Sequence, residues 1–140
     1  MSFQKKIDEL KLILPEAKAP VGNYVATKIS GKMLFVSGQI SIDENGELIK
    51  GKVGKDLDTQ SGYNAARRCA LSIISQVKKA CDNDLSKIKS CVKLTGFVNS
   101  TNDFTEQPKV INGASDLIAS IFGDAGMHTR AAVSTNSLPL

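Results

Sequence analysis

The chain has 140 residues, of which 41% are hydrophobic and 23% are charged, so we expect one globular domain with its own core. Its formal net charge is +4 at pH 7, and its basic residues are scattered along the sequence without forming a dense block. Aromatic residues make up only 5% of the chain, so a nucleic-acid partner is not expected. No apolar stretch of about 18 residues occurs, and a membrane span is therefore not expected either.

The cysteine and histidine content argues against a metal site. The three cysteines, Cys69, Cys81 and Cys91, are widely spaced, and the chain has a single histidine. No C-x-x-C pair occurs, so we expect no bound metal. Unpaired thiols are typical of a reducing compartment, and the charged N-terminal segment does not resemble a secretory signal. The expected location is the cytoplasm.

A short helix and a β-hairpin are the first predicted elements. Apolar residues at helical spacing predict a helix over residues 3–14, which Pro15 ends. Two strand-like runs, residues 24–29 and 33–37, flank a short turn and predict a hairpin. The next turn signal lies at residues 43–46.

Two amphipathic helices alternate with two further predicted strands. Thr59 is the predicted N-cap of the first helix, which reaches Ala80. A strand is predicted over residues 91–98, followed by a second helix over residues 105–122 with Gly123 as its C-cap. The last predicted strand holds Arg130.

This order of elements predicts an α+β fold. Two β-helix-β units with right-handed crossovers place both helices on one face of a single mixed sheet, which gives a two-layer sandwich. The other sheet face lacks a cover, so we expect a homo-oligomer. We assign residues 1–140 to one domain, and we expect a closing strand after Leu138 and Pro139, beyond Leu140.

Arg130 is the main candidate for a functional residue. It lies in the strand-like run of residues 127–133, next to the small side chains of Ala131 and Ala132. A guanidinium keeps its charge and fits a carboxylate or phosphate through two parallel hydrogen bonds. An ordinary surface arginine on a half-exposed strand is the alternative, which this segment alone leaves open.

Four short segments occur in an order that points to a known family. They are Ala19–Tyr24, Phe35–Ile40 with its Ser-Gly-Gln triplet, Val98–Phe104, and Thr129–Val133 followed by Leu138 and Pro139. Together they resemble the reactive intermediate deaminase (Rid or YjgF) family, long labelled L-PSP endoribonucleases, over residues 19–140. The resemblance implies a chorismate-mutase-like fold assembled as a homotrimer.

The resemblance also implies an activity and a set of site residues. Family members hydrolyse reactive 2-imino or 2-enamino acids to 2-oxo acids and ammonia, without a cofactor, in a pocket between subunits. The match implies that Arg130 and Tyr24 are catalytic, with Arg130 binding the substrate carboxylate. It also implies that Ser37, Gly38 and Asn112 bind the substrate. Such a substrate is already electrophilic, so binding and orientation toward water suffice, without a covalent nucleophile.

The chain departs from the family pattern in three places. The links at residues 51–58 and 105–109 are longer than in compact members, which indicates a divergent branch. Ala132 stands where compact members often carry a cysteine. The family's water-positioning glutamate belongs to the closing strand, so the resemblance assigns it to no residue up to Leu140.

Alternative interpretations stay open at this point. A non-catalytic sensor that binds small 2-oxo acids would have the same shape and the same arginine, and the old family label adds an endoribonuclease. Tyr24 as a packing residue, Ser37 as a turn residue and Asn112 as a solvent-facing helix residue are the structural alternatives. His128 is expected to be solvated at the start of its strand.

Overall fold

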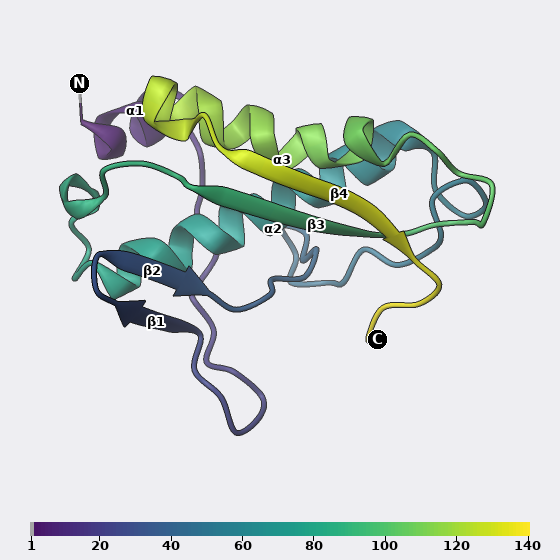
Figure 1. The fold of residues 1–140 in the computed structure, drawn as a ribbon, viewed down its shortest axis with the longest axis horizontal. Coiled ribbons are helices and arrows are strands. Elements are labelled where there is room, and N and C mark those ends of the chain that lie inside the picture. Colours follow the sequence, from purple (N-terminus) through teal and green to yellow (C-terminus); the bar gives the residue numbers. More distant parts are fainter. Residues whose placement is uncertain (1) are drawn as a thin grey trace.

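A computed structural model describes residues 2–140 (Figure 1) and has an α+β fold, as predicted. Its helices and strands are α1 (Phe3–Glu9), β1 (Thr27–Ser30), β2 (Met33–Val36), α2 (Thr59–Ala80), β3 (Lys93–Asn99), α3 (Gln107–Phe122) and β4 (Thr129–Thr135). Two short 3-10 helices, η1 (Leu85–Lys87) and η2 (Gly123–Gly126), follow α2 and α3.

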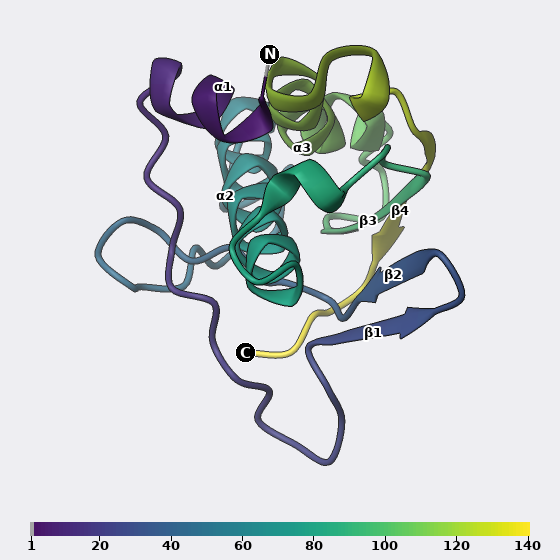
Figure 2. The ribbon, with the colours of Figure 1, turned by 90° about the vertical axis from the view of Figure 1, so that its left-hand side faces the viewer.

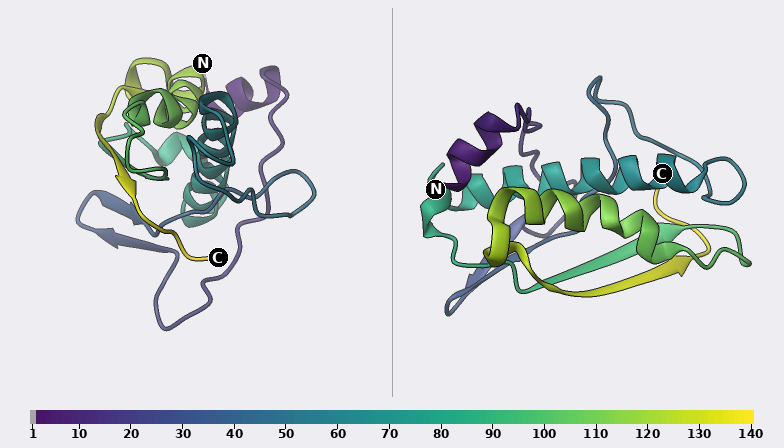
Figure 3. Two further views of the ribbon diagram at one scale, coloured as in Figure 1. Left: turned by 90° about the vertical axis from the view of Figure 1, so that its right-hand side faces the viewer. Right: turned by 90° about the horizontal axis from the view of Figure 1, so that it is seen from above.

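The elements form two layers, which are separated most clearly in the end-on view of Figure 2. Helices α2 and α3 lie side by side in one layer, and the strands form the other (Figure 3). The sequence predicted one mixed sheet, but the hydrogen bonds join the strands as two pairs, antiparallel β1–β2 and parallel β3–β4. Within residues 2–140 no ladder connects the two pairs.

The register of β3 and β4 determines which way Arg130 points. Leu94 pairs with Arg130, and Phe97 pairs with Val133. Leu94 is buried against the helices, whereas Phe97 is 60% exposed on the opposite face. Paired residues of neighbouring strands point to the same face, so Arg130 points to the helix side of β4.

Two glycines allow α3 to approach its neighbours closely, one at its contact with α2 and one at its contact with β3. A Cβ atom added to Gly113 on α3 would lie 1.9 Å from the carbonyl oxygen of Tyr63 on α2. A Cβ atom added to Gly96 on β3 would lie 2.4 Å from Cδ1 of Ile111 on α3. Helix α3 is therefore fixed against both α2 and β3, and its position relative to β4 follows.

The hydrophobic core lies between the two helices and the strands. The stripe predicted for α3 is confirmed, since every member is buried: Val110, Ala114, Leu117, Ile118 and Ile121. From α2 the core receives Ala66, Ala70, Leu71 and Ile74, and from α1 it receives Ile7. The largest fully buried side chains, Leu71 and Ile74, mark its centre.

The first helix is shorter than predicted, because α1 ends at Glu9 and not at residue 14. Lys11 adopts a left-handed conformation with φ 53°. The Leu12 amide then donates to the Ile7 carbonyl at 3.1 Å, and the Lys11 amide donates to the Asp8 carbonyl at 3.0 Å. This pair of bonds is a Schellman motif, which ends the helix well before Pro15.

The starts of the two long helices also differ slightly from the prediction. Asp58, not Thr59, is the N-cap of α2, and its carboxylate accepts a hydrogen bond from the Ser61 amide at 2.7 Å. The hydrogen bonds from Ser61 lower the pKa of Asp58 below its usual value. Helix α3 begins at Gln107, two residues later than predicted, with a proline in its first turn. Its C-cap is Gly123 with φ 58°, as predicted.

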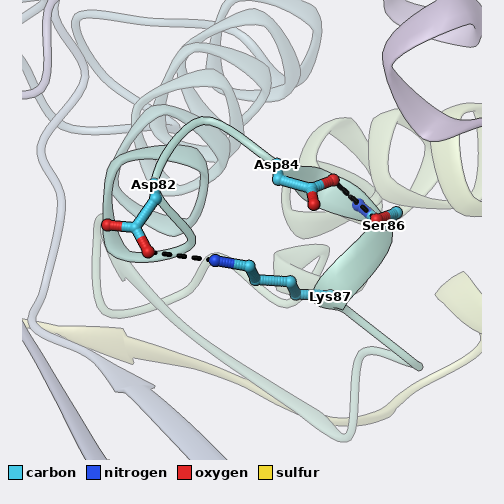
Figure 4. A network of polar contacts seen from close by, with 4 residues as sticks. All are labelled: Asp82, Asp84, Ser86 and Lys87. Carbon is cyan, nitrogen blue, oxygen red and sulfur yellow. Dashed lines mark hydrogen bonds and ion pairs between the residues drawn. The ribbon is translucent and has the colours of Figure 1, made fainter.

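A polar turn reverses the chain after α2 (Figure 4). Asp82 and Asn83 have positive φ angles of 54° and 63°. Asp84 caps η1 by accepting from the Ser86 amide, and Lys87 donates to Asp82 at 2.9 Å. This exposed ion pair contributes little stability, so the turn depends mainly on backbone conformation and capping.

Candidate functional site

Arg130 is anchored to α3 by two neutral side chains. Its Nη1 donates to Oδ1 of Asn112 at 2.8 Å and to Oγ of Ser115 at 3.1 Å. Asn112 and Ser115 are three residues apart on α3, so they occupy neighbouring positions on one face of the helix. The guanidinium therefore has a defined direction although the residue is exposed.

The charge of Arg130 has no acidic partner within the part of the chain that the structure describes. The ion pairs found among residues 2–140 are Lys87–Asp82 and Lys109–Glu106, both elsewhere on the surface. The hydrogen bonds found for the guanidinium use Nη1 alone, whereas a guanidinium carries five N–H donors on three nitrogens. An oriented positive charge of this kind can accept a small anion.

Two further residues complete this group, and the sequence prediction missed both. Ser115 Oγ lies 2.9 Å from Nε2 of His128, and Nδ1 of His128 lies 2.6 Å from the carbonyl oxygen of Gly126. His128 is half-buried and bonded at both ring nitrogens, so the expectation of a solvated histidine was wrong. The sequence offered two signals. His128 precedes Arg130 by two residues, and Ser115 follows Asn112 by about one helical turn.

The other predicted site residues gather at the hairpin. Ser37 follows β2, and its hydroxyl donates to the Val25 carbonyl at 2.7 Å, while its amide donates to the Ala26 carbonyl at 2.9 Å. These bonds hold the end of β2 against the segment that carries Tyr24. Tyr24 is 57% exposed and lines a hollow of about 270 Å³, together with Gln76 and other residues near the end of α2. Gly38 is exposed directly after Ser37.

The predicted site therefore falls into two groups within one chain. The first, called the arginine group here, contains Arg130 and Asn112, joined by a hydrogen bond, together with Ser115 and His128, which were not predicted. The second, called the hairpin group, contains Tyr24, Ser37 and Gly38. Arg130 does not line the hollow beside Tyr24. Of the five predicted residues, only Tyr24 lines this hollow.

The cysteines are unsuited to nucleophilic chemistry. Burial raises the pKa of Cys69 to about 11, and burial also raises the pKa values of Cys81 and Cys91. A thiol with a raised pKa holds little thiolate near neutral pH.

Among residues 2–140, no group of three or more His, Cys, Asp or Glu side chains is arranged to hold a metal ion. No helix in the described part of the chain combines the length and apolar character that crossing a membrane requires.

Comparison with known proteins identifies the family. The family model described as "YjgF/chorismate_mutase-like, putative endoribonuclease" matches residues 5–140. The chain therefore belongs to the YjgF/chorismate-mutase-like family, as its short motifs predicted.

Individual relatives agree with this assignment. Protein TCP17 of Trypanosoma cruzi is 46% identical over 134 residues, which cover 95% of this chain and 83% of the relative. A Shewanella oneidensis protein named as a "putative endoribonuclease" is 37% identical. Its crystal structure matches with a TM-score of 0.94 over 99% of this chain and 91% of that protein. The E. coli protein TdcF, whose structure contains bound serine, is 25% identical with a TM-score of 0.58, covering 89% of this chain and 84% of TdcF.

Proposed function

We propose that the protein is a hydrolytic deaminase that converts reactive 2-imino or 2-enamino acids to 2-oxo acids and ammonia. The observation that carries this proposal is the arginine group: a guanidinium fixed by Asn112 and Ser115, with no acidic partner among the described residues. A small organic acid supplies the carboxylate that such a guanidinium lacks. Bound serine in TdcF, a small molecule with a carboxylate, supports a pocket of this chemical class.

The proposed reaction adds water across a carbon–nitrogen double bond. The Nε and Nη2 nitrogens of Arg130 would hold the substrate carboxylate in two parallel hydrogen bonds. This grip fixes the direction of the neighbouring C=N carbon, so that a water molecule attacks a single oriented electrophile. The carbinolamine that forms loses ammonia and leaves the 2-oxo acid. The chain's part in this scheme is to bind, orient and polarise the substrate.

Assembly would supply the remaining part of the site. The outer strand face exposes apolar side chains, with Phe97 60% exposed, Phe35 57% and Val133 45%. Exposed apolar surface of this kind favours association with further copies. We propose a homotrimer in which the hairpin group of one copy lies beside the arginine group of its neighbour, so that Tyr24 contacts a substrate bound at Arg130. We also propose a cytoplasmic location for the protein, because free thiols such as its three cysteines are typical of a reducing compartment.

A binding module for 2-oxo acids is the second candidate. Arg130 donates both of its observed hydrogen bonds to neutral side chains, and the nearby His128 is bonded at both ring nitrogens. Neither an acid nor a free imidazole from residues 2–140 is hydrogen-bonded to the guanidinium. This arrangement is sufficient for binding an anion, whereas turnover also needs an activated water.

A coupled assay separates the two candidates. An amino-acid dehydratase or oxidase generates 2-iminobutanoate in place, and its loss is followed with and without the purified protein. The deaminase proposal predicts faster loss than the spontaneous rate, with kcat/KM falling roughly 100-fold or more in Arg130→Ala, as expected for losing two charge-assisted hydrogen bonds.

The matched control is Arg67→Ala, because it removes the same charge from α2. It should retain wild-type activity. Binding of 2-oxobutanoate without any acceleration would favour the binding module. Equal activity in wild type and Arg130→Ala would exclude both proposals at this site.

A further inference from the structure

We propose that His128 is a positioning residue for the arginine group. It acts through Ser115 and keeps the Arg130 guanidinium in the direction that binds a carboxylate. This inference rests on the proposed function, which assigns the carboxylate to Arg130. The residues form one continuous path, with Arg130 Nη1 3.1 Å from Ser115 Oγ, Ser115 Oγ 2.9 Å from His128 Nε2, and His128 Nδ1 2.6 Å from the Gly126 carbonyl.

The direction of every hydrogen bond in this path follows from its two ends. A backbone carbonyl only accepts, so Nδ1 of His128 carries the hydrogen that points to Gly126. In the neutral imidazole, Nε2 is then an acceptor, and the Ser115 hydroxyl donates to it. The guanidinium only donates, so the lone pairs of Ser115 Oγ face Nη1 of Arg130. The path runs from Arg130 through Ser115 and His128 to Gly126 without a conflict.

The far end of the path is held rigidly. A Cβ atom added to Gly126 would lie 2.7 Å from the Ile118 carbonyl oxygen, so η2 packs directly on α3 at this point. Gly126 is buried, and its carbonyl therefore provides a fixed acceptor for His128. His128 precedes Arg130 by two residues, and side chains two apart on an extended segment point to the same side. The backbone of β4 and the path through α3 thus hold Arg130 from two directions.

A serine alone would hold the guanidinium less firmly. The hydroxyl of Ser115 rotates freely about its C–O bond, and its hydrogen can turn toward the guanidinium as readily as away from it. When Nε2 of His128 accepts that hydrogen, the Ser115 hydroxyl keeps one orientation, with its lone pairs toward Arg130. Both ring nitrogens of His128 are occupied inside the protein, so His128 does not touch the substrate. It acts only through Ser115.

The first test reads the tautomer of the imidazole directly. Because the chain has a single histidine, its ring ¹⁵N signals need no residue assignment, and their couplings to Hδ2 and Hε1 distinguish Nε2 from Nδ1. At pH 8, where an ordinary imidazole is neutral, we expect the Nδ1–H tautomer, with a non-protonated Nε2. Ser115→Ala should shift the Nε2 signal, because that nitrogen loses its donor. The Nε2–H tautomer in wild-type protein would overturn the proposal. This measurement needs no substrate, so it tests the hydrogen-bond path even if wild-type protein lacks deaminase activity.

The second test uses the split between KM and kcat. Ser115→Ala and His128→Phe should each raise KM about 5- to 10-fold with kcat within about 2-fold, because a neutral hydrogen bond that orients a binding group is lost. The double variant should be no worse than the poorer single variant, since both changes break one path. His128→Gln keeps an acceptor within reach of Ser115 and should restore much of the loss.

Controls separate positioning from general damage. Ser120→Ala removes another serine hydroxyl from α3, one that bonds only the Leu117 carbonyl, and should leave KM unchanged. Thermal melting of each variant monitors folding. Additive effects of Ser115→Ala and His128→Phe, or an unchanged KM in either, would contradict a shared path. Absence of deaminase activity in the wild-type protein would instead count against the proposed function.

Discussion

The arginine group and the hairpin group differ in how completely one subunit assembles them. On the α3–β4 side, Arg130 and Asn112 are joined by a hydrogen bond and lie on elements whose mutual position is fixed by packing. On the hairpin side, Tyr24 is exposed at the rim of an open hollow and has no polar partner among the described residues. The charged part of the proposed site is preorganised within one chain, whereas the aromatic part is available to a second copy.

This difference suggests a division of labour between the two groups. A guanidinium without an acidic partner must be held by neutral contacts. Without them its side chain would sample many conformations, and ordering it would weaken anion binding. The hairpin group needs no such anchoring if its partner surface belongs to a neighbouring subunit. The following experiments test this difference, beginning with the largest expected effect.

The largest expected effect is complementation between two inactive variants. Arg130→Ala and Tyr24→Ala should each lower kcat/KM by about 100-fold, because one removes the carboxylate grip and the other a polar group of the pocket. If each site uses Arg130 from one copy and Tyr24 from its neighbour, subunit exchange should restore about one quarter of the sites in a random closed ring. Activity is measured after mixing under mild denaturant and refolding.

The matching control is each variant carried alone through the same exchange, which should stay inactive. A mixture that remains as inactive as its components would place both groups in the same subunit's site and contradict the division described above.

The next effect concerns the scaffold of the arginine group. Gly113→Ala would place a Cβ atom 1.9 Å from the Tyr63 carbonyl oxygen, so α3 has to move away from α2. We expect a loss of about 3 kcal/mol in the free energy of unfolding, the upper range for overpacking. Urea denaturation measures it. Gly38→Ala is the control, because an added Cβ there meets nothing within 4 Å, and its midpoint should not change. Equal midpoints for both variants would contradict the close helix contact.

A smaller effect tests the absence of an acidic partner. Asn112→Asp would put a carboxylate where Oδ1 now lies 2.8 Å from Nη1, so the new charge competes with the substrate. We expect about a 30-fold loss of affinity for 2-oxobutanoate, against about 5-fold for Asn112→Ala, which removes only a neutral acceptor. Asn64→Asp on the exposed side of α2 adds the same charge elsewhere and should bind normally. An Asp variant that binds as well as the Ala variant would argue against competition for the guanidinium.

The smallest effect lies in a region remote from both groups. The Ser61 amide lowers the pKa of Asp58, the N-cap of α2, so the ionised form is favoured in the folded chain. A lowered folded pKa gives stability that is present above the unfolded value near 3.9 and is lost as the pH falls through the folded value. Asp58→Asn should lower the Tm by about 2 °C at pH 7, a difference that shrinks in strong acid. A Tm difference that persists unchanged at low pH would contradict this origin.

Much of the fold was predictable because its signals are local. The apolar stripes of α2 and α3 and the turn residues around the hairpin each act over a few neighbouring positions. The prediction was wrong at two helix ends, where a backbone conformation and a capping contact set the boundary. A lysine in left-handed conformation ended α1 at Glu9, and Asp58 took the capping role expected of Thr59.

The candidate site was predictable only in part for a related reason. The resemblance implied substrate-binding roles for Arg130 and Asn112, and the structure joins these two side chains by a hydrogen bond. Ser115 and His128 carry no motif, and they meet only because η2 folds back onto α3. The separation of Tyr24 from Arg130 depends on how the N-terminal segment passes along the end of α2. Short motifs that occur in order along a sequence do not specify that path.

The most direct test of the account is a calorimetric titration of 2-oxobutanoate into wild-type protein and into Arg130→Ala. We expect saturable binding to wild type that weakens with added salt, because a charged pair forms, and a Kd at least about 30-fold higher in the variant. The same Kd in both proteins would show that the carboxylate is held elsewhere, and the assignment of Arg130 would be wrong.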